Sequence, residues 1–143
     1  PQMTNNFPWV HAFLAALPGV ESDFKPEWGW TRYKVGGKMF AAVCKNGRGE
    51  DYLLTLKADP VEAGLARAAF WRVFPGYYCT KHCWNSVYLC DSGADWAEVT
   101  ARIRDAASEA TGELPEALLR EMCVRAHALM AATLPKRLRD QLC

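Results

Sequence analysis

The segment Tyr33–Ala41 constrains the fold of this chain more than any other, because it has the pattern of a β-strand with two adjacent glycines in its middle. Strands usually avoid glycine, since glycine loses much backbone entropy on folding and offers no side chain to pack. Gly36 and Gly37 therefore indicate a bend, a bulge or a close approach of another backbone or a ligand. A lysine flanks the pair on each side, Lys34 and Lys38, which makes this segment a candidate binding element.

The length of 143 residues predicts one domain, and a hydrophobic fraction of 50% is enough for an ordinary buried core. We expect Met3 to be the native start, so that the domain spans residues 3–143 and excludes Pro1 and Gln2. The net charge of +1 gives no global bias toward nucleic acids or acidic membranes. No apolar run approaches the roughly 20 residues that span a bilayer, and no secretory signal is visible. These features predict a cytoplasmic protein without a membrane partner.

The cysteines are scattered and follow no export signal, which favours free thiols in a reducing cytoplasm over disulfides. There are six of them: Cys44, Cys79, Cys83, Cys90, Cys123 and Cys143. Three of these lie near His82, but the cluster has no second pair of ligands at the spacing that zinc sites use. We therefore expect no metal site and no cofactor.

Alternating patterns and short turns predict two antiparallel strand pairs. In the first, a long strand Thr31–Lys45, broken near the glycines, pairs with Tyr52–Lys57. In the second, Val73–Lys81 pairs with Cys83–Leu89. Val20–Phe24 is a further short strand.

Apolar residues at helical spacing predict helices before, between and after these strands. Asp59 and Pro60 begin the helix between the two pairs, as N-cap and first helical residue, and Glu62 completes a capping box. Asp95–Glu113 and Leu118–Met130 are predicted to be helical near the C-terminus. The order is helix, three strands, helix, two strands, helices. Without βαβ alternation, it predicts an α+β fold in two layers, an antiparallel sheet with helices on one face.

Several of these segments together resemble the MmcQ/YjbR family of small bacterial proteins. The most specific part is Lys34–Phe40. It is supported by Trp28-Gly29, Lys57, Asp59-Pro60, Pro75-Gly76, Lys81, Trp84, Asn85, Val87, Leu134-Pro135-Lys136 and Arg139. The resemblance implies a two-layer α/β domain similar to secretion-chaperone-like folds, also described as a double-wing DNA-binding arrangement. It implies no catalytic residues.

The chain departs from the family pattern in two places. Asp95–Glu113 adds an amphipathic helix before the final one, and this helix could cover a face that is open in other members. In the final helix, Ala126-His127 replaces the Ser-Tyr that the family tends to have.

Nucleic-acid binding is the first functional hypothesis, because both predicted hairpins carry lysine. Lys34 and Lys38 share one face of a regular strand, whereas a bulge at the glycines would turn one of them away. Cations beside aromatic rings can hold phosphates and stack on bases. The candidate binding residues are Lys34, Lys38, Lys57, Lys81, His82, Trp84, Asn85, Trp28, Lys136, Arg137 and Arg139. The net charge of +1 instead favours solvated lysines on an exposed sheet face.

The alternative hypothesis is a module that binds a protein or a small ligand with the sheet face and the Trp28–Trp30 loop. An apolar groove rimmed by Trp28 and Trp84 would favour it, and a contiguous field of Lys and Arg would favour DNA. Enzymatic activity is disfavoured, because no phosphate-loop, zincin, nucleophile-elbow or dinucleotide motif occurs. A nucleophile pair of Cys83 and His127 stays open, without support from its spacing. We expect a non-catalytic binding protein, with DNA as its ligand.

Overall fold

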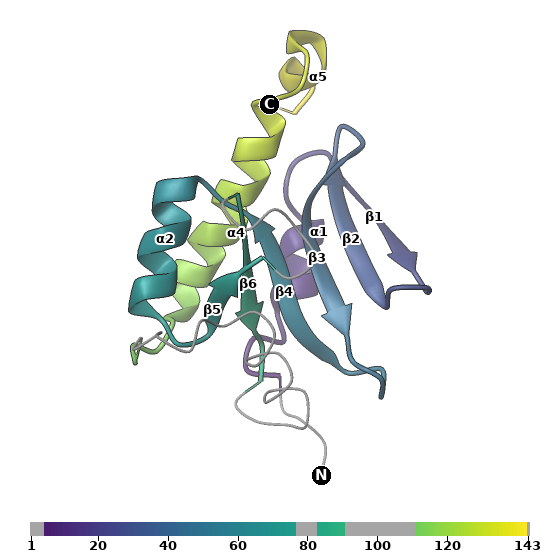
Figure 1. The fold of residues 1–143 in the computed structure, drawn as a ribbon. Coiled ribbons are helices and arrows are strands. Elements are labelled where there is room, and N and C mark those ends of the chain that lie inside the picture. The colour runs from purple at the N-terminus through teal and green to yellow at the C-terminus, as the bar shows by residue number, and fades with distance from the viewer. Residues whose placement is uncertain (1–4, 77–82, 91–110, 143) are drawn as a thin grey trace.

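The computed structural model describes residues 5–76, 83–90 and 111–142. Its elements follow one another as α1 (Val10–Ala15), β1 (Val20–Lys25), β2 (Trp30–Val35), β3 (Lys38–Lys45), β4 (Asp51–Lys57), α2 (Pro60–Ala69), β5 (Val73–Pro75), β6 (Trp84–Tyr88), α4 (Glu116–Ala131) and α5 (Lys136–Asp140). The strands form one sheet in the order β1-β2-β3-β4-β6-β5, and all neighbours are antiparallel (Figure 1). The predicted α+β class is confirmed.

The glycine pair forms the turn between two strands, and the prediction of one long strand Thr31–Lys45 is wrong. Gly36 and Gly37 have φ angles of 58° and 80°, the positive values that a two-residue type I′ hairpin turn requires. Four strands instead of three therefore precede α2. β3, the second of the two strands, pairs with β4 as predicted.

The second predicted hairpin is confirmed where the structure describes it. β5 pairs antiparallel with β6, and β6 also pairs antiparallel with β4. β4 and β5 therefore run in the same direction with β6 between them, and α2 connects one to the other. Residues 77–82 of this hairpin and most of the predicted helix Asp95–Glu113 lie outside the described residues. None of the helices in the described part of the chain has the length and apolar character that crossing a bilayer requires.

Three helices cover the same face of the sheet, as predicted. Strand register aligns Tyr33 with Ala41, Ala41 with Leu56, and Leu56 with Asn85, so these side chains share one face. Tyr33 meets His11 of α1. Leu56 and Asn85 line a groove between α2 and α4. Figure 1 shows these helices packed together against the sheet.

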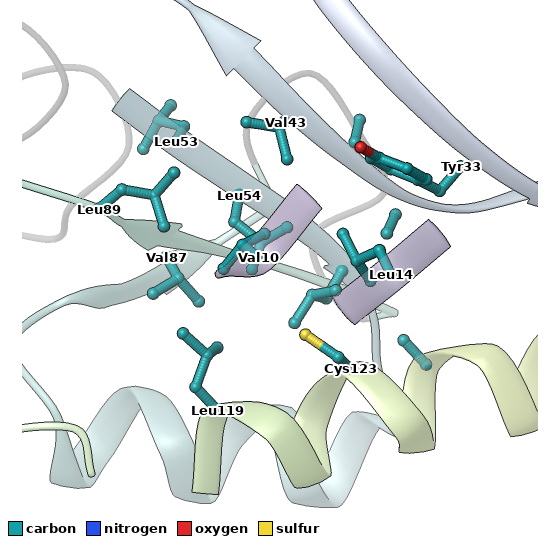
Figure 2. Close-up of a cluster of buried hydrophobic side chains, with 14 of the residues drawn as sticks. Val10, Leu14, Tyr33, Val43, Leu53, Leu54, Val87, Leu89, Leu119 and Cys123 are labelled. Atoms are coloured by element: carbon teal, nitrogen blue, oxygen red, sulfur yellow. The ribbon is translucent and has the colours of Figure 1, made fainter. Parts of the chain in front are cut away.

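The hydrophobic core lies between this face and the helices (Figure 2). Val43, Leu54 and Val87 are aligned across β3, β4 and β6. Val10 and Leu14 of α1 and Leu119 and Cys123 of α4 lie on the same side of the sheet, and all four are buried. Burial of these apolar side chains is the main favourable contribution to the stability of the fold.

The opposite face is also buried along the central strands. Cys44, Leu53 and Tyr88 are aligned on it, and their exposed fractions are 3%, 0% and 0%. The hydroxyls of Thr55 and Ser86 form a buried hydrogen bond of 3.0 Å there, which satisfies two polar groups that burial would otherwise penalise. The central strands therefore do not present the open, solvated sheet face that the sequence suggested.

Exchanging either turn glycine for alanine tests how the hairpin turn meets the C-terminal segment. A Cβ atom on Gly36 would lie 2.6 Å from the Leu134 side chain, whereas one on Gly37 would meet nothing within 4 Å. Both substitutions strain a positive φ, at a cost of about 1–3 kcal/mol each. We expect Gly36→Ala to lower the free energy of unfolding more than Gly37→Ala, in urea titrations followed by circular dichroism. Equal losses would show that Leu134 does not pack against the turn.

Candidate functional site

The two lysines that flank the glycine pair do not lie together. The ladder between β2 and β3 shifts register after Tyr33, and Phe40 is the extra residue. Neither predicted alternative is observed, because the glycines form the turn and the bulge lies at Phe40 instead of at the glycines. The Lys34 ammonium lies 3.1 Å from Asp23 of β1, whereas the Lys38 ammonium lies 3.3 Å from the hydroxyl of Thr133, beyond α4. Because Lys34 pairs with Met39 and Lys38 pairs with Val35, the two-residue turn places the two lysines on opposite faces of the hairpin.

Asp23 pairs with both Lys34 and Arg32, so that one carboxylate offsets part of the positive charge on this side of the sheet. Its carboxylate accepts two hydrogen bonds of 2.7 Å from the Arg32 guanidinium in addition to the contact with Lys34. The bonds from Arg32 are the main reason why the pKa of Asp23 lies far below its usual range, and the bond from Lys34 adds to them. Lys34 is therefore poorly placed to hold a phosphate.

Lys57, Trp84 and Asn85 lie at neighbouring positions of β4 and β6. The Lys57 ammonium lies 5.7 Å from the centroid of the Trp84 ring, within cation–π range. Asn85 is a buried residue instead of a surface contact: its amide oxygen accepts a hydrogen bond of 2.8 Å from Arg67. Lys81 and His82 lie outside the described residues.

Trp28 and Trp84 do not rim a common groove. Trp28 precedes β2, and Trp84 begins β6. Because β2 and β6 run in opposite directions, the starts of these strands lie at opposite ends of the sheet. Trp28 is 56% exposed and packs edge-on against Trp30, with their ring centroids 5.4 Å apart. The groove predicted for the alternative hypothesis is therefore not formed.

Most of the basic candidates lie at one end of the sheet, which we call the turn end. At this end β2 and β4 finish and β3 and β6 begin, so it carries Lys38, Lys57 and Trp84. The C-terminal segment reaches the same end, because Thr133 bonds Lys38 and Leu134 lies against Gly36. Figure 1 shows α5 there, beyond the end of α4.

Four exposed cations therefore form what we call the α5 basic cluster: Lys38, Lys136, Arg137 and Arg139. Within residues 5–76, 83–90 and 111–142, none of the four makes an ion pair with a carboxylate. By contrast, Arg32, Lys45 and Arg48 are each held by a carboxylate at 2.6–2.9 Å. The cluster is one part of the described surface where positive charge is available to a ligand; Lys25 and Lys57 also make no ion pair with a described carboxylate.

A groove of about 900 Å³ between α2 and α4 was not predicted from the sequence. Small side chains of both helices leave this space, among them Ala63, Ala66 and Ala128. Glu62 of α2, which the sequence suggested as part of a capping box, instead contacts Arg125 of α4 at 3.2 Å. Its predicted partner Asp59 does cap the helix, since it accepts hydrogen bonds from two backbone amides of the first turn.

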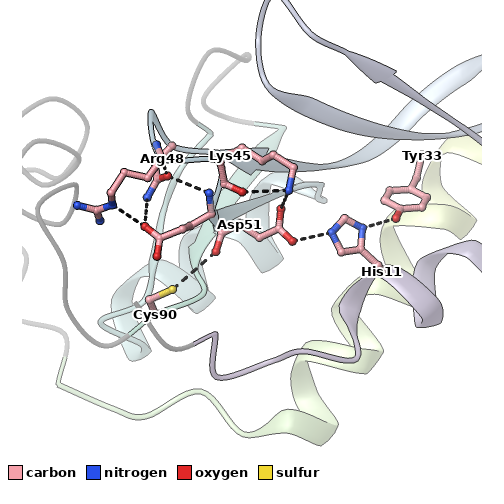
Figure 3. Close-up of polar contacts among 9 residues, drawn as sticks. His11, Tyr33, Lys45, Arg48, Asp51 and Cys90 are labelled. Atoms are coloured by element: carbon pink, nitrogen blue, oxygen red, sulfur yellow. Dashed lines mark hydrogen bonds and ion pairs between the residues drawn. The ribbon is translucent and has the colours of Figure 1, made fainter. Parts of the chain in front are cut away.

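A second feature missed from the sequence is a polar network around His11 (Figure 3). The Tyr33 hydroxyl donates to Nδ1 of His11, and Nε2 donates to Asp51 at 2.9 Å. Lys45 contacts the other Asp51 oxygen at 2.9 Å. Burial, followed by the Asp51 charge, raises the pKa of Tyr33 to about 12. Because the network joins α1 to β2, β3 and β4, it holds the first helix on the sheet.

The possible nucleophile pair is not formed. His127 donates from Nε2 to the Pro18 carbonyl at 2.7 Å, and its ring packs edge-on against Phe40. No hydrogen bond joins it to Cys83 in the described part of the chain. His127 instead connects α4 to the loop before β1.

Among the described residues, no group of three His, Cys, Asp or Glu side chains could hold a metal ion, and Cys79 and His82 lie outside them.

Asp51→Asn tests the His11 network. The pKa of Asp51 is lowered mainly by the His11 hydrogen bond and further by Lys45, while burial opposes the shift. A lowered pKa adds stability above the ordinary aspartate pKa, and this stability is lost as the pH falls through the folded-state pKa. We expect the variant to lose about 1–2 kcal/mol of unfolding free energy near pH 7 and clearly less near pH 3. Equal losses in urea titrations at both pH values would contradict this account.

The comparisons with known proteins agree with this fold. A solved Deinococcus radiodurans protein with the family-model domain DUF419 is 21% identical, with 99% of this chain and 91% of that chain covered and a TM-score of 0.69. A Pseudomonas syringae structure is 17% identical, with 63% of this chain and 87% of that chain covered, and its TM-score of 0.39 carries no argument. No curated protein matches. The family model YjbR matches residues 15–106. Because this match spans more than half of the 143 residues, the chain belongs to the YjbR family.

Proposed function

We propose that this protein is a non-catalytic DNA-binding protein whose contact surface is the α5 basic cluster. The proposal rests on the contact at the turn end between the β2–β3 hairpin and the C-terminal segment. There, the Lys38–Thr133 hydrogen bond joins the β2–β3 hairpin to the segment that leads into α5. This junction gathers four cations without carboxylate partners in the described part of the chain. These cations outnumber the one carboxylate of α5, Asp140, which favours a local positive field despite a net charge of +1.

The chemistry of the cluster favours phosphate contacts over base readout. Lysine and arginine side chains on an exposed surface neutralise phosphates and release counterions, which makes affinity strongly dependent on salt. Such contacts position a protein on a duplex without reading its sequence. Trp84 lies at the same end of the sheet beside Lys57, and a ring next to a cation suits stacking on an unpaired base. We therefore expect weak binding with little sequence preference.

Fluorescence anisotropy with a labelled duplex of arbitrary sequence tests the proposal. We expect binding at about 50 mM salt that falls with a log–log slope of about −3.6, because each of the four cations neutralises one phosphate and each phosphate contributes about −0.9. Lys136→Glu/Arg137→Glu should abolish this binding at the same salt concentration. Lys34→Glu should have a small effect on DNA binding, because the Lys34 ammonium already pairs with the Asp23 carboxylate.

A matched control reverses two charges at the other end of the sheet. Lys25 ends β1, and Arg48 lies between β3 and β4. The variant Lys25→Glu/Arg48→Glu carries the same net charge as the test variant but should keep most of the binding. The proposal fails if wild type does not bind at low salt, or if both double variants lose binding equally. Circular dichroism and thermal unfolding of each variant exclude loss of fold as the cause.

A cytoplasmic location, where thiols stay reduced, is part of the proposal. Cys44, Cys83, Cys90 and Cys123 are free, and Cys79 and Cys143 lie outside the described residues. We expect six free thiols when the protein is denatured without reductant and titrated with a thiol reagent. A count of four or fewer would contradict the predicted compartment. In the native protein the half-buried Cys83 should react before Cys123, because burial raises the pKa of the Cys123 thiol to about 12.

A further inference from the structure

The groove between α2 and α4 has the size and lining of a small-molecule site. Its volume of about 900 Å³ lies within the range of ligand pockets. Its walls are mostly apolar, with Phe13, Phe70, Leu118 and Met122 among the large side chains. Leu65 and Val124 also line it and remain 67% and 46% exposed, so the groove opens to solvent.

One buried polar group in the groove is incompletely satisfied. Asn85 is 1% exposed, lies on the groove lining and comes from the central strand β6. Its amide oxygen is fixed by the Arg67 guanidinium at 2.8 Å, which assigns the amide orientation. The amide nitrogen has two hydrogens, and its one acceptor among the described residues is the Ala63 carbonyl at 3.3 Å. The amide nitrogen therefore keeps one hydrogen that no described residue accepts, in a residue of the groove lining.

The groove has a polar end and an apolar end. Asn85 and Ala63 lie near the start of α2, where Arg125 of α4 contacts Glu62. The other end carries large apolar side chains: a bridge between Phe70 and Gly112 brings the end of α2 close to the start of α4, so that Leu118 lies there, while Arg120 and Glu121 also line the groove. Between Ala63 and Phe70 the helix rises about 10 Å, at 1.5 Å per residue.

We propose that the α2–α4 groove binds an unbranched apolar molecule that ends in a hydrogen-bond acceptor, of the class of the medium-chain fatty acids. The acceptor group accepts a hydrogen bond from the Asn85 N–H at the polar end. The chain lies along the apolar walls toward Phe70 and Leu118. A buried N–H without an acceptor is unfavourable, and a ligand that accepts a hydrogen bond from Asn85 removes this cost. The site should therefore prefer such a ligand to a plain hydrocarbon.

Isothermal titration calorimetry with decanoate and decanol, kept below their aggregation concentrations, tests this assignment. We expect one molecule of decanoate per chain, bound about tenfold more tightly than decanol, as a charge-assisted hydrogen bond provides. Asn85→Asp keeps the oxygen that Arg67 needs but removes the free N–H and adds negative charge. This variant should bind decanoate about tenfold more weakly and decanol about as well as wild type.

Two variants that fill the groove from opposite walls locate the site. Ala66→Trp on α2 and Ala128→Trp on α4 should each abolish binding of both ligands, and either variant suffices if the other does not fold. Phe24→Ser is the matched control, because Phe24 is a 49% exposed apolar residue on β1, outside the groove. It should bind like wild type. The proposal is overturned if neither ligand binds, if binding survives both tryptophan variants, or if Asn85→Asp weakens decanoate and decanol equally.

Discussion

The packing of α4 across the central strands is the constraint on which the rest of the structure depends. Leu119 and Cys123 of this helix are fully buried, and they face the aligned β3–β4–β6 residues of the core. The same helix forms one wall of the groove. Its C-terminal end leads through Thr133 and Leu134 to α5, which places the basic residues of α5 beside the β2–β3 turn. Loss of this packing would remove both candidate binding surfaces at once.

Features that depend on neighbouring residues could be predicted from the sequence. The Asp59-Pro60 pair marks the start of α2, because an N-cap carboxylate and a proline at the first position act within one turn. Alternation of apolar residues identified β4 and β6, and short turns implied antiparallel pairing. The glycine pair was located correctly but assigned to the wrong structure. Two positive φ angles make a hairpin turn, whereas the sequence equally allows a break inside one strand.

The arrangement of the site depends on contacts between residues far apart in the chain, which local patterns do not encode. Thr133 bonds Lys38, which lies 95 positions earlier in the chain. Lys34 pairs with Asp23 of β1, and Asp23 belongs to no sequence motif that would predict this contact. The two-residue turn places Lys34 and Lys38 on opposite faces of the hairpin, which a single strand broken at the glycines did not predict. The groove arises because small residues of α2 and α4 face each other, a property of the pair of helices that neither segment shows alone.

α4 forms one wall of the groove and leads into α5, which carries most of the basic cluster. The central claim is that DNA contacts the end of the sheet where the hairpin turn and α5 lie together. Amide chemical-shift mapping by NMR during a duplex titration at low salt tests this claim most directly. It should perturb Gly37 and Lys38 together with Lys136–Arg139, and leave the Lys25 and Arg48 end unchanged. Perturbations centred on that opposite end, or none at all, would contradict the account.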